Sequence, residues 1–258
     1  MSETKLIVKD LEMVFDGKQT LNKVSFDVKN GEFLSILGPS GCGKTTILRI
    51  LIGLLKPTAG TVIKDGEDIT DLPAAERGMG IVFQNYALFE NMTVLQNVEY
   101  ALKIKKENKS KEARQQVRQR ALEVIEHMGL IEHKDKLPRM LSGGQQQRAA
   151  IARTMVLNPD IILFDEPMSA LDVETRLSLR AELKRIQKEF GTTMIYITHD
   201  QEEAFAMSDR IMVMREANIV QLDTPENIID NPADDYVKSF VIKNLQIKID
   251  SLLKCVRS

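Results

Sequence analysis

Residues 38–46 read GPSGCGKTT, and this short stretch decides the fold. A strand-like apolar segment, FLSIL at residues 33–37, precedes it, and residues 47–55, apolar and long enough for a buried helix, follow it. Strand, glycine loop and helix are the context in which the pattern G-x-x-x-x-G-K-[ST] indicates a phosphate-binding loop. Glycines let successive N–H groups face an anion, and the helix N-terminus adds unpaired amides and the positive end of its dipole. The stretch therefore predicts a nucleoside-triphosphate site, and its flanks disfavour the alternative of a glycine-rich turn with a chance Lys-Thr pair.

Two side chains of this loop have predicted roles. Lys44 is expected to contact the β- and γ-phosphates, and the Thr45 hydroxyl is expected to bind Mg²⁺. The loop residues predicted to hold the nucleotide are Ser40, Gly41, Cys42, Gly43, Lys44, Thr45 and Thr46. Because Cys42 lies inside the loop, alkylation of its thiol is expected to inhibit, with bound nucleotide protecting.

Composition limits the class of protein. The chain has 258 residues, enough for one large domain or two small ones. Its net charge of −2 gives no basic signature, so nucleic acid is a poor first guess for a partner. Cys42 and Cys255 do not form a disulfide framework, which suits a reducing cytosol, and no Cys/His cluster has the spacing of a zinc site. We find no apolar signal region and no apolar run near the ~20 residues of a membrane span, and therefore expect a cytosolic protein.

Residues 6–15 and 21–28 read as strands separated by a turn, and the second alternates apolar and polar residues as a half-exposed antiparallel strand does. Phe15 ends the first of them. A strand-end aromatic is more often part of the core, but it also offers a flat face on which an adenine ring can stack.

The middle of the chain combines a strand end with a helical block. Residues 80–84 are strand-like and deliver Gln84 to a loop. Such a glutamine is usually solvated, but beside a nucleotide its amide could reach Mg²⁺ or the attacking water. Residues 93–127 have helical spacing of apolar side chains and indicate a helical insertion within an α/β domain, with the basic run 103–111 as a solvated linker.

A second candidate anion site follows at residues 141–148, LSGGQQQR. Ser142 is a good N-cap, and the helix behind it presents a hydroxyl, two glycine amides and a positive dipole end. By itself this segment is as readily a capped helix start as a binding site.

Residues 161–166, IILFDE, form a continuous apolar run that ends in two carboxylates, which is typical of a buried parallel strand. Because ligands of doubly wound sheets lie beyond the carboxyl ends of strands, both acids are expected to face the nucleotide. Asp165 is the predicted Mg²⁺ ligand and Glu166 the predicted general base. Residues 193–197 form another buried strand, so His199 is expected at the same edge, bonding the γ-phosphate and holding Glu166 in place.

Together, residues 38–45, Gln84, residues 141–145, 161–166 and 169–172 (SALD), and His199 resemble the nucleotide-binding subunit of an ABC transporter. The resemblance covers roughly residues 6–240. It implies an α/β fold, in which a RecA-like P-loop NTPase core with an antiparallel β-subdomain carries an α-helical subdomain inserted at about residues 90–158. One domain would then occupy residues 1–240. Residues 241–258 would be a short tail without a regulatory β-domain. Its apolar residues have the spacing of an amphipathic helix, most simply one docked on the core, with a partner contact as the alternative: Val241, Leu245, Ile249, Leu252 and Val256.

The same resemblance implies a head-to-tail dimer. Each ATP would lie between two sets of residues: Lys44, Thr45, Gln84, Asp165, Glu166 and His199 of one copy, and Ser142, Gly143, Gly144 and Gln145 of the other. Asp172 would lie across the dimer seam and couple the two sites. Phe15 matches the position of the adenine-stacking aromatic of the family.

The implied partners follow from the family as well. Membrane-spanning permease subunits would contact the region just after Gln84, and an extracytoplasmic solute-binding protein would act indirectly. Three segments resemble those of importer subunits for sugars, polyamines, iron or inorganic anions: residues 84–89, the Gln-rich signature at 141–148 and residues 200–204. The chain would then be cytoplasmic and peripheral on the inner face of the membrane. One alternative is a soluble ABC ATPase of translation or DNA repair. A second is a pure nucleotide-binding scaffold, against which the intact Lys44, Glu166 and His199 argue.

Overall fold

The computed structural model describes residues 3–104, 110–169 and 171–256, with side chains described as far as residue 250. Most of the basic run at residues 103–111 therefore lies outside the described residues. The chain forms two compact units: Met1–Arg77 with Lys184–Ser258, and Gly78–Leu183. Among the residues described, none of the helices combines the length and the apolar character needed to cross a bilayer.

The first unit begins with an antiparallel sheet in the order β2-β1-β4-β5. Its strands are β1 (Thr4–Phe15), β2 (Lys18–Lys29), β4 (Ala59–Lys64) and β5 (Glu67–Asp68). Phe15 pairs with Lys18 across a two-residue turn, in which Asp16 and Gly17 have φ of 47° and 78°. Positive φ at both positions matches the twist of a hairpin, and Asp-Gly is a favoured pair there.

A second set of strands in this unit runs in the order β10-β9-β3-β8. They are β3 (Phe33–Leu37), β8 (Thr193–Thr198), β9 (Arg210–Arg215) and β10 (Asn218–Asp223). Strand β3 is parallel to both β8 and β9, and every residue of β3 and β8 is buried. Continuous burial is the reason that both strands are rich in apolar residues, with Ser35 the polar residue inside β3.

Helix α1 (Lys44–Leu51) follows the glycine loop, and Arg77 fixes its end. The Arg77 guanidinium, 3% exposed, donates hydrogen bonds to the carbonyl oxygens of Ile50 at 2.8 Å and Leu51 at 2.9 Å. The last carbonyls of a helix have no partner within it, so this side chain satisfies groups that burial would otherwise leave unpaired.

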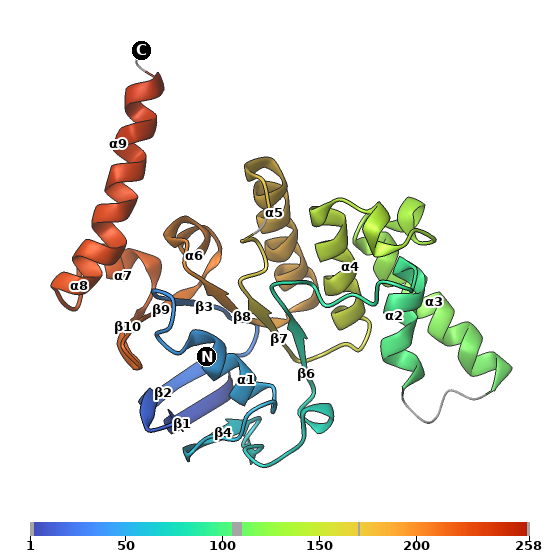
Figure 1. Cartoon of the computed structure of the whole chain (residues 1–258), viewed down its shortest axis with the longest axis horizontal. Coiled ribbons are helices and arrows are strands. Elements are labelled where there is room, and N and C mark those ends of the chain that lie inside the picture. The colour runs from blue at the N-terminus through green and yellow to red at the C-terminus, as the bar shows by residue number, and fades with distance from the viewer. Residues whose placement is uncertain (1–2, 105–109, 170, 257–258) are drawn as a thin grey trace. The chain divides into compact units, whose positions relative to one another are not determined.

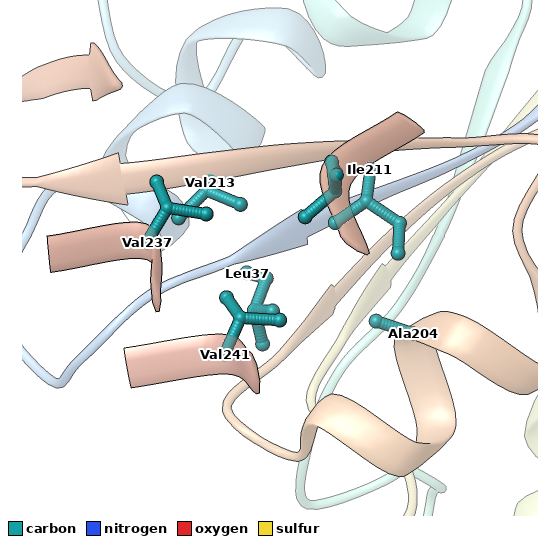
Figure 2. Close-up of a cluster of buried hydrophobic side chains, with 7 residues drawn as sticks. Leu37, Ala204, Ile211, Val213, Val237 and Val241 are labelled. Atoms are coloured by element: carbon teal, nitrogen blue, oxygen red, sulfur yellow. The ribbon is translucent and has the colours of Figure 1, made fainter. Parts of the chain in front are cut away.

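After β8, the helices of the described part of the first unit are α6 (Gln201–Met207), α7 (Pro225–Asp230), α8 (Asp235–Val237), the π-helix Lys238–Lys243 and α9 (Asn244–Val256). They cover β3 and β9 through one buried cluster, shown in Figure 2, made of Leu37, Ala204, Ile211, Val213, Ile228, Val237 and Val241. Docking of the tail on the core holds for Val241, which is buried, and for Leu245, which packs against this cluster. The prediction is wrong for Ile249, which is 50% exposed because α9 runs away from the strands (Figure 1). The side chains of Leu252 and Val256 lie outside the described ones.

The second unit contains the parallel strands β6 (Met79–Val82) and β7 (Ile161–Asp165). Between them in the chain lie α2 (Val94–Lys103), α3 (Lys111–His127), two short 3₁₀ helices and α4 (Gly143–Met155). Helix α5 (Val173–Phe190) starts in this unit and ends in the first. The boundaries of 90 and 158 for an inserted helical subdomain stay a prediction.

Candidate functional site

The phosphate loop connects β3 to α1, and its backbone requires glycine at the helix start. Gly43 is the N-cap of α1 and has φ of 107°. A Cβ added there would lie 2.6 Å from the carbonyl oxygen of Thr20 and 2.7 Å from Cδ2 of Leu21. Only a glycine combines this backbone conformation with so close an approach. The loop therefore has the shape and the amide donors that a phosphate group needs.

The ammonium of Lys44 lies within the loop. The residue is 5% exposed, and its Nζ donates hydrogen bonds to the carbonyl oxygens of Gly38 at 2.8 Å and Pro39 at 3.0 Å. A buried positive charge beside the first turn of a helix favours an anion strongly. Thr45, the next residue, adds a hydroxyl oxygen, which is a ligand type that Mg²⁺ accepts.

Cys42 is the inward-facing side chain of the same loop. It is 4% exposed, and a Cβ added at Gly38 would lie 2.7 Å from its sulfur. Burial raises the pKa of the Cys42 thiol, although Lys44 acts in the opposite direction. The thiol is therefore a packing group of the loop and stays protonated near neutral pH.

His199 leaves the sheet at the same edge as the phosphate loop. Leu37, the last residue of β3, pairs with Thr198, the last residue of the adjacent parallel strand β8. The segments that follow, Gly38 onward and His199 onward, therefore start side by side, as expected for a ligand site at the carboxyl end of a parallel sheet. His199 itself is exposed.

A buried network fixes the residues around His199. The hydroxyls of Tyr196 and Thr198 both donate to the same carboxylate oxygen of Glu203, each at 2.8 Å. The Thr198 hydroxyl also accepts a hydrogen bond from the N–H of Asp200 at 3.0 Å. Glu203 is 4% exposed, so these bonds form in a low-dielectric interior where they hold their geometry well.

Phe15 lies at the end of β1, beside the hairpin turn, and is 41% exposed. Its ring is therefore not part of the core of the unit. An exposed aromatic face suits stacking of a base, and this role stays a prediction.

In the second unit, Gln84 and the acidic pair Asp165–Glu166 lie at the carboxyl ends of two adjacent parallel strands. Val82 pairs with Phe164, so the segments after β6 and β7 start side by side. The Gln84 amide donates to the Ser169 hydroxyl at 3.1 Å, and that hydroxyl donates to the carbonyl oxygen of Glu166 at 3.1 Å. The predicted amide and the loop of the predicted base are thus connected through one serine, which the sequence pattern had not singled out for this purpose.

Glu166 has a left-handed backbone, with φ of 46°. This conformation is uncommon for a residue with a side chain and costs on the order of 1 kcal/mol or more. Strained residues of this kind concentrate at functional sites, where the surrounding structure maintains them. Asp165, one residue earlier, ends β7 and is half-buried, and its carboxylate is a suitable oxygen ligand for Mg²⁺.

The second candidate anion site is a complete capping box. The Ser142 hydroxyl accepts from the N–H of Gln145 at 3.3 Å, and the Gln145 side-chain oxygen accepts from the N–H of Ser142 at 3.0 Å. Ser142 is exposed, so its O–H stays available as a donor at the N-terminus of α4. The arrangement combines a cap and a potential phosphate contact in the same residue.

The glycines of this motif permit close packing against the start of α5. A Cβ on Gly144 would lie 2.5 Å from Cγ2 of Thr175, and one on Gly143 would lie 3.2 Å from Cδ2 of Leu171. Thr175 in turn donates its N–H and O–H to the Asp172 carboxylate, at 2.9 and 2.7 Å, which lowers the pKa of Asp172. Ala170 of the 169–172 motif lies outside the described residues.

Sequence reasoning missed two polar side chains, the buried Asn97 and the partly buried Arg153, that hold the segment after Gln84. Asn97, with no exposed surface, accepts from the N–H of Phe89 at 2.8 Å and donates to the carbonyl oxygens of Phe89, Met92 and Thr93. Arg153 bonds the backbone at residues 86 and 87. A polar residue among the apolar positions of a helix was the available signal.

The candidate residues fall in both units. Phe15, the loop residues 40–46 and His199 belong to the first. The second contains Gln84, residues 142–145, Asp165 and Glu166. The strand registers start the phosphate loop and the His199 segment side by side in the first unit, and the Gln84 and Asp165 segments side by side in the second.

Comparison with known proteins gives consistent relatives. The family described as "ABC transporter" matches residues 21–169. The chain is 44% identical over 241 residues to a spermidine/putrescine import ATP-binding protein of Marinobacter nauticus, with 93% of this chain and 63% of that protein aligned. A protein of the same name from Bacillus cereus is 46% identical over 241 residues, with 93% and 72% aligned. The chain thus spans under two thirds of the length of the first of these relatives.

Solved structures resemble the fold as well. The dimeric post-hydrolysis ATP-binding cassette MJ0796, bound to ADP and Pi, has a TM-score of 0.75 and 36% identity, covering 85% of this chain and 98% of that one. CbiO1 of Clostridium perfringens, part of the ABC transporter complex cbiONQ, has a TM-score of 0.82 and 28% identity, covering 99% of this chain and 100% of that one. These neighbours show that the fold is that of an α/β ATP-binding cassette.

Proposed function

This chain belongs to the ABC transporter family, and on that premise we propose that it is the ATP-hydrolysing subunit of a membrane importer. The observation that carries the proposal is the register of β3 with β8, which starts the phosphate loop and the His199 segment side by side. The names of the most similar relatives, import ATP-binding proteins, favour this function over a soluble ATPase of translation or DNA repair.

In the proposed reaction, the residues of the first unit bind and neutralise the phosphates. The loop amides and Lys44 contact the β- and γ-phosphates, Phe15 stacks on adenine, and His199 donates to the γ-phosphate. Phosphoryl transfer needs positioning and charge neutralisation more than covalent help, and these groups supply both. Mg²⁺, when bound, neutralises the charge that develops on the phosphate oxygens.

The residues of the second unit act on the metal and the water. Asp165 would hold Mg²⁺, a role proposed for Thr45 in the first unit as well, and Gln84 would contact the metal or the attacking water. Glu166 accepts a proton from that water. Its left-handed backbone is a strained conformation of the kind that concentrates at functional sites, which supports this role. The Gln84–Ser169–Glu166 connection supports joint action of the two loops.

We infer further that Ser142, Gly143, Gly144 and Gln145 contact the nucleotide held by a second copy of the chain. The exposed Ser142 hydroxyl at a helix N-terminus is suited to a γ-phosphate. The dimeric state of the MJ0796 cassettes supports this arrangement. Asp172 would then couple the two sites across the seam.

The proposed partners are permease subunits in the membrane, which contact residues 85–92, and indirectly an extracytoplasmic solute-binding protein. The chain would act at the inner face of the membrane. Polyamines are the first cargo class to test, because the relatives are named for spermidine and putrescine import.

Hydrolysis by the Glu166→Gln variant tests the proposal. The substitution keeps the shape of the side chain and removes the base, so turnover is expected to fall about 100-fold or more while ATP binding stays intact. Glu67→Gln, an exposed acid of β5, is the matched control and should behave as the wild type. Unchanged turnover in Glu166→Gln, or no hydrolysis in the wild type with permease present, would reject the proposal.

A further inference from the structure

The C-terminal segment, defined here as the π-helix Lys238–Lys243 together with α9, contacts the loop that carries His199. Lys248 of α9 forms an ion pair with Asp200, with 3.0 Å between Nζ and Oδ1. The Gln201 amide donates a hydrogen bond to the carbonyl oxygen of Phe240 at 3.1 Å. Asp200 and Gln201 are the two residues that follow His199, so the segment holds the chain directly after the histidine.

The paired carboxylate oxygen also orders the start of α6. Oδ1 of Asp200 accepts the N–H of Glu202 at 2.9 Å, as an N-cap does, and the same oxygen contacts Lys248. The Asp200 side chain is 18% exposed and that of Lys248 is 45% exposed. The Lys248 ammonium therefore contacts Asp200, the N-cap residue at which the chain passes from His199 into α6.

The segment is anchored firmly enough to act as a support. Val237 and Val241 have no exposed surface and share a buried cluster with Ala204 of α6 (Figure 2). The rings of Tyr236 and Phe240 stack with centroids 5.3 Å apart and an interplanar angle of 7°. Close-packed contacts of this kind transmit displacement rather than absorb it.

The π-helical turn leaves a main-chain carbonyl group able to accept a hydrogen bond from α6. In a π-helix the hydrogen-bond register widens to five residues, and such turns are frequent at functional sites. The Phe240 carbonyl oxygen accepts from the side chains of Gln201, at 3.1 Å, and Asn244, at 2.9 Å. The irregular turn thus presents an acceptor to the first residue of α6.

We propose that this C-terminal segment positions His199, with Lys248 as a positioning residue that acts through Asp200. The inference rests on the proposed function, in which His199 contacts the γ-phosphate. An ion pair this exposed contributes little to folding, but a small displacement of a catalytic group lowers the rate steeply. The effect of the pair should therefore appear in turnover rather than in stability.

The test is ATP hydrolysis by Lys248→Met, beside Lys248→Arg, which keeps the charge, and Lys243→Met, an exposed lysine of the same segment. Lys248→Met is expected to lower kcat about three- to tenfold with KM for ATP unchanged, which is less than the roughly 100-fold loss that a 1 Å misplacement of a catalytic group can cause. Its Tm should stay within about 2 °C of the wild type. Lys248→Arg should keep the kcat of the wild type, and so should Lys243→Met.

Asp200→Asn supplies a second route to the same pair, because asparagine keeps the cap and removes the charge. It should reproduce the kcat of Lys248→Met, and the double variant should be no slower than either single one. An additive loss in the double variant, or a kcat of Lys248→Met equal to that of the wild type, would overturn the inference. So would a parallel loss of Tm that Lys248→Arg does not restore.

His199→Ala in the same assay separates this inference from the function on which it rests. If His199→Ala loses turnover while Lys248→Met turns over ATP as fast as the wild type, only the positioning role is rejected. Wild-type turnover in His199→Ala rejects the proposed contact with the γ-phosphate, and the positioning role fails with it.

Discussion

The Arg153 guanidinium of α4 donates a hydrogen bond to the carbonyl oxygen of Ala87 at 2.6 Å. It also donates to the carbonyl oxygen of Tyr86 at 3.0 Å. Tyr86 and Ala87 have φ of 60° and 48°, left-handed values that neither residue type favours. The helix that begins after Ser142 therefore holds the strained segment that follows Gln84, and the two motifs are mechanically joined within the second unit.

Removal of this clamp should loosen residues 85–89. Arg153→Met deletes the donors to two carbonyl groups, and the free energy of unfolding should fall by about 2 kcal/mol. Amide hydrogen exchange at residues 85–89 should accelerate while exchange in β7 changes little. The exposed Arg139→Met is the control. Exchange at residues 85–89 equal to that of the wild type would contradict the clamp.

The close approach of Gly144 to Thr175 predicts a destabilising substitution at residue 144 and a second substitution at residue 175 that reverses its effect. In Gly144→Ala the new methyl group meets Cγ2 of Thr175, whose rotamer is held by its bond to Asp172. The free energy of unfolding should fall by about 1–3 kcal/mol, and a second change, Thr175→Ser, should restore most of it because serine lacks Cγ2 but keeps the hydroxyl. Chemical denaturation measures both.

Gly143→Ala is the matched control for that pair, because its methyl group meets a more flexible leucine at 3.2 Å. It should cost less than Gly144→Ala, and Thr175→Ser should not improve it. Failure of the serine to rescue Gly144→Ala would show that the methyl contact is not the cause.

The burial of Cys42 predicts a slow thiol. Because burial raises its pKa, the reactive thiolate fraction at pH 7 is below that of a free cysteine and grows only as pH rises above the ordinary thiol range. In a Cys255→Ser background, maleimide labelling at pH 7 should be about tenfold or more slower than labelling of free cysteine. Labelling as fast as that of the free amino acid would contradict the buried position.

The sequence predicted those features that depend on local pattern. Each of these features follows from a run of a few neighbouring residues, and the structure contains all of them: the phosphate loop, the strands that lead to Gln84, Asp165 and His199, and the Ser142 cap. The predicted chemical roles of the site residues stay predictions.

Features that depend on distant partners were out of reach. The Arg153 clamp and the contact of Lys248 with Asp200 each join residues that are far apart in the chain, and no periodic pattern encodes them. Helical spacing likewise suggested that Ile249 is docked, because it reports which residues share a face but not where the supporting surface ends.

In the proposed function, two copies of this chain share each ATP. Light scattering on the Glu166→Gln variant with saturating ATP and Mg²⁺ tests it most directly, since slow hydrolysis preserves the bridging nucleotide. We predict the mass of two chains, and the mass of one chain when Ser142→Arg is added to that variant. A protein that stays at the mass of one chain while fully loaded with ATP, or a dimer indifferent to Ser142→Arg, would contradict the account.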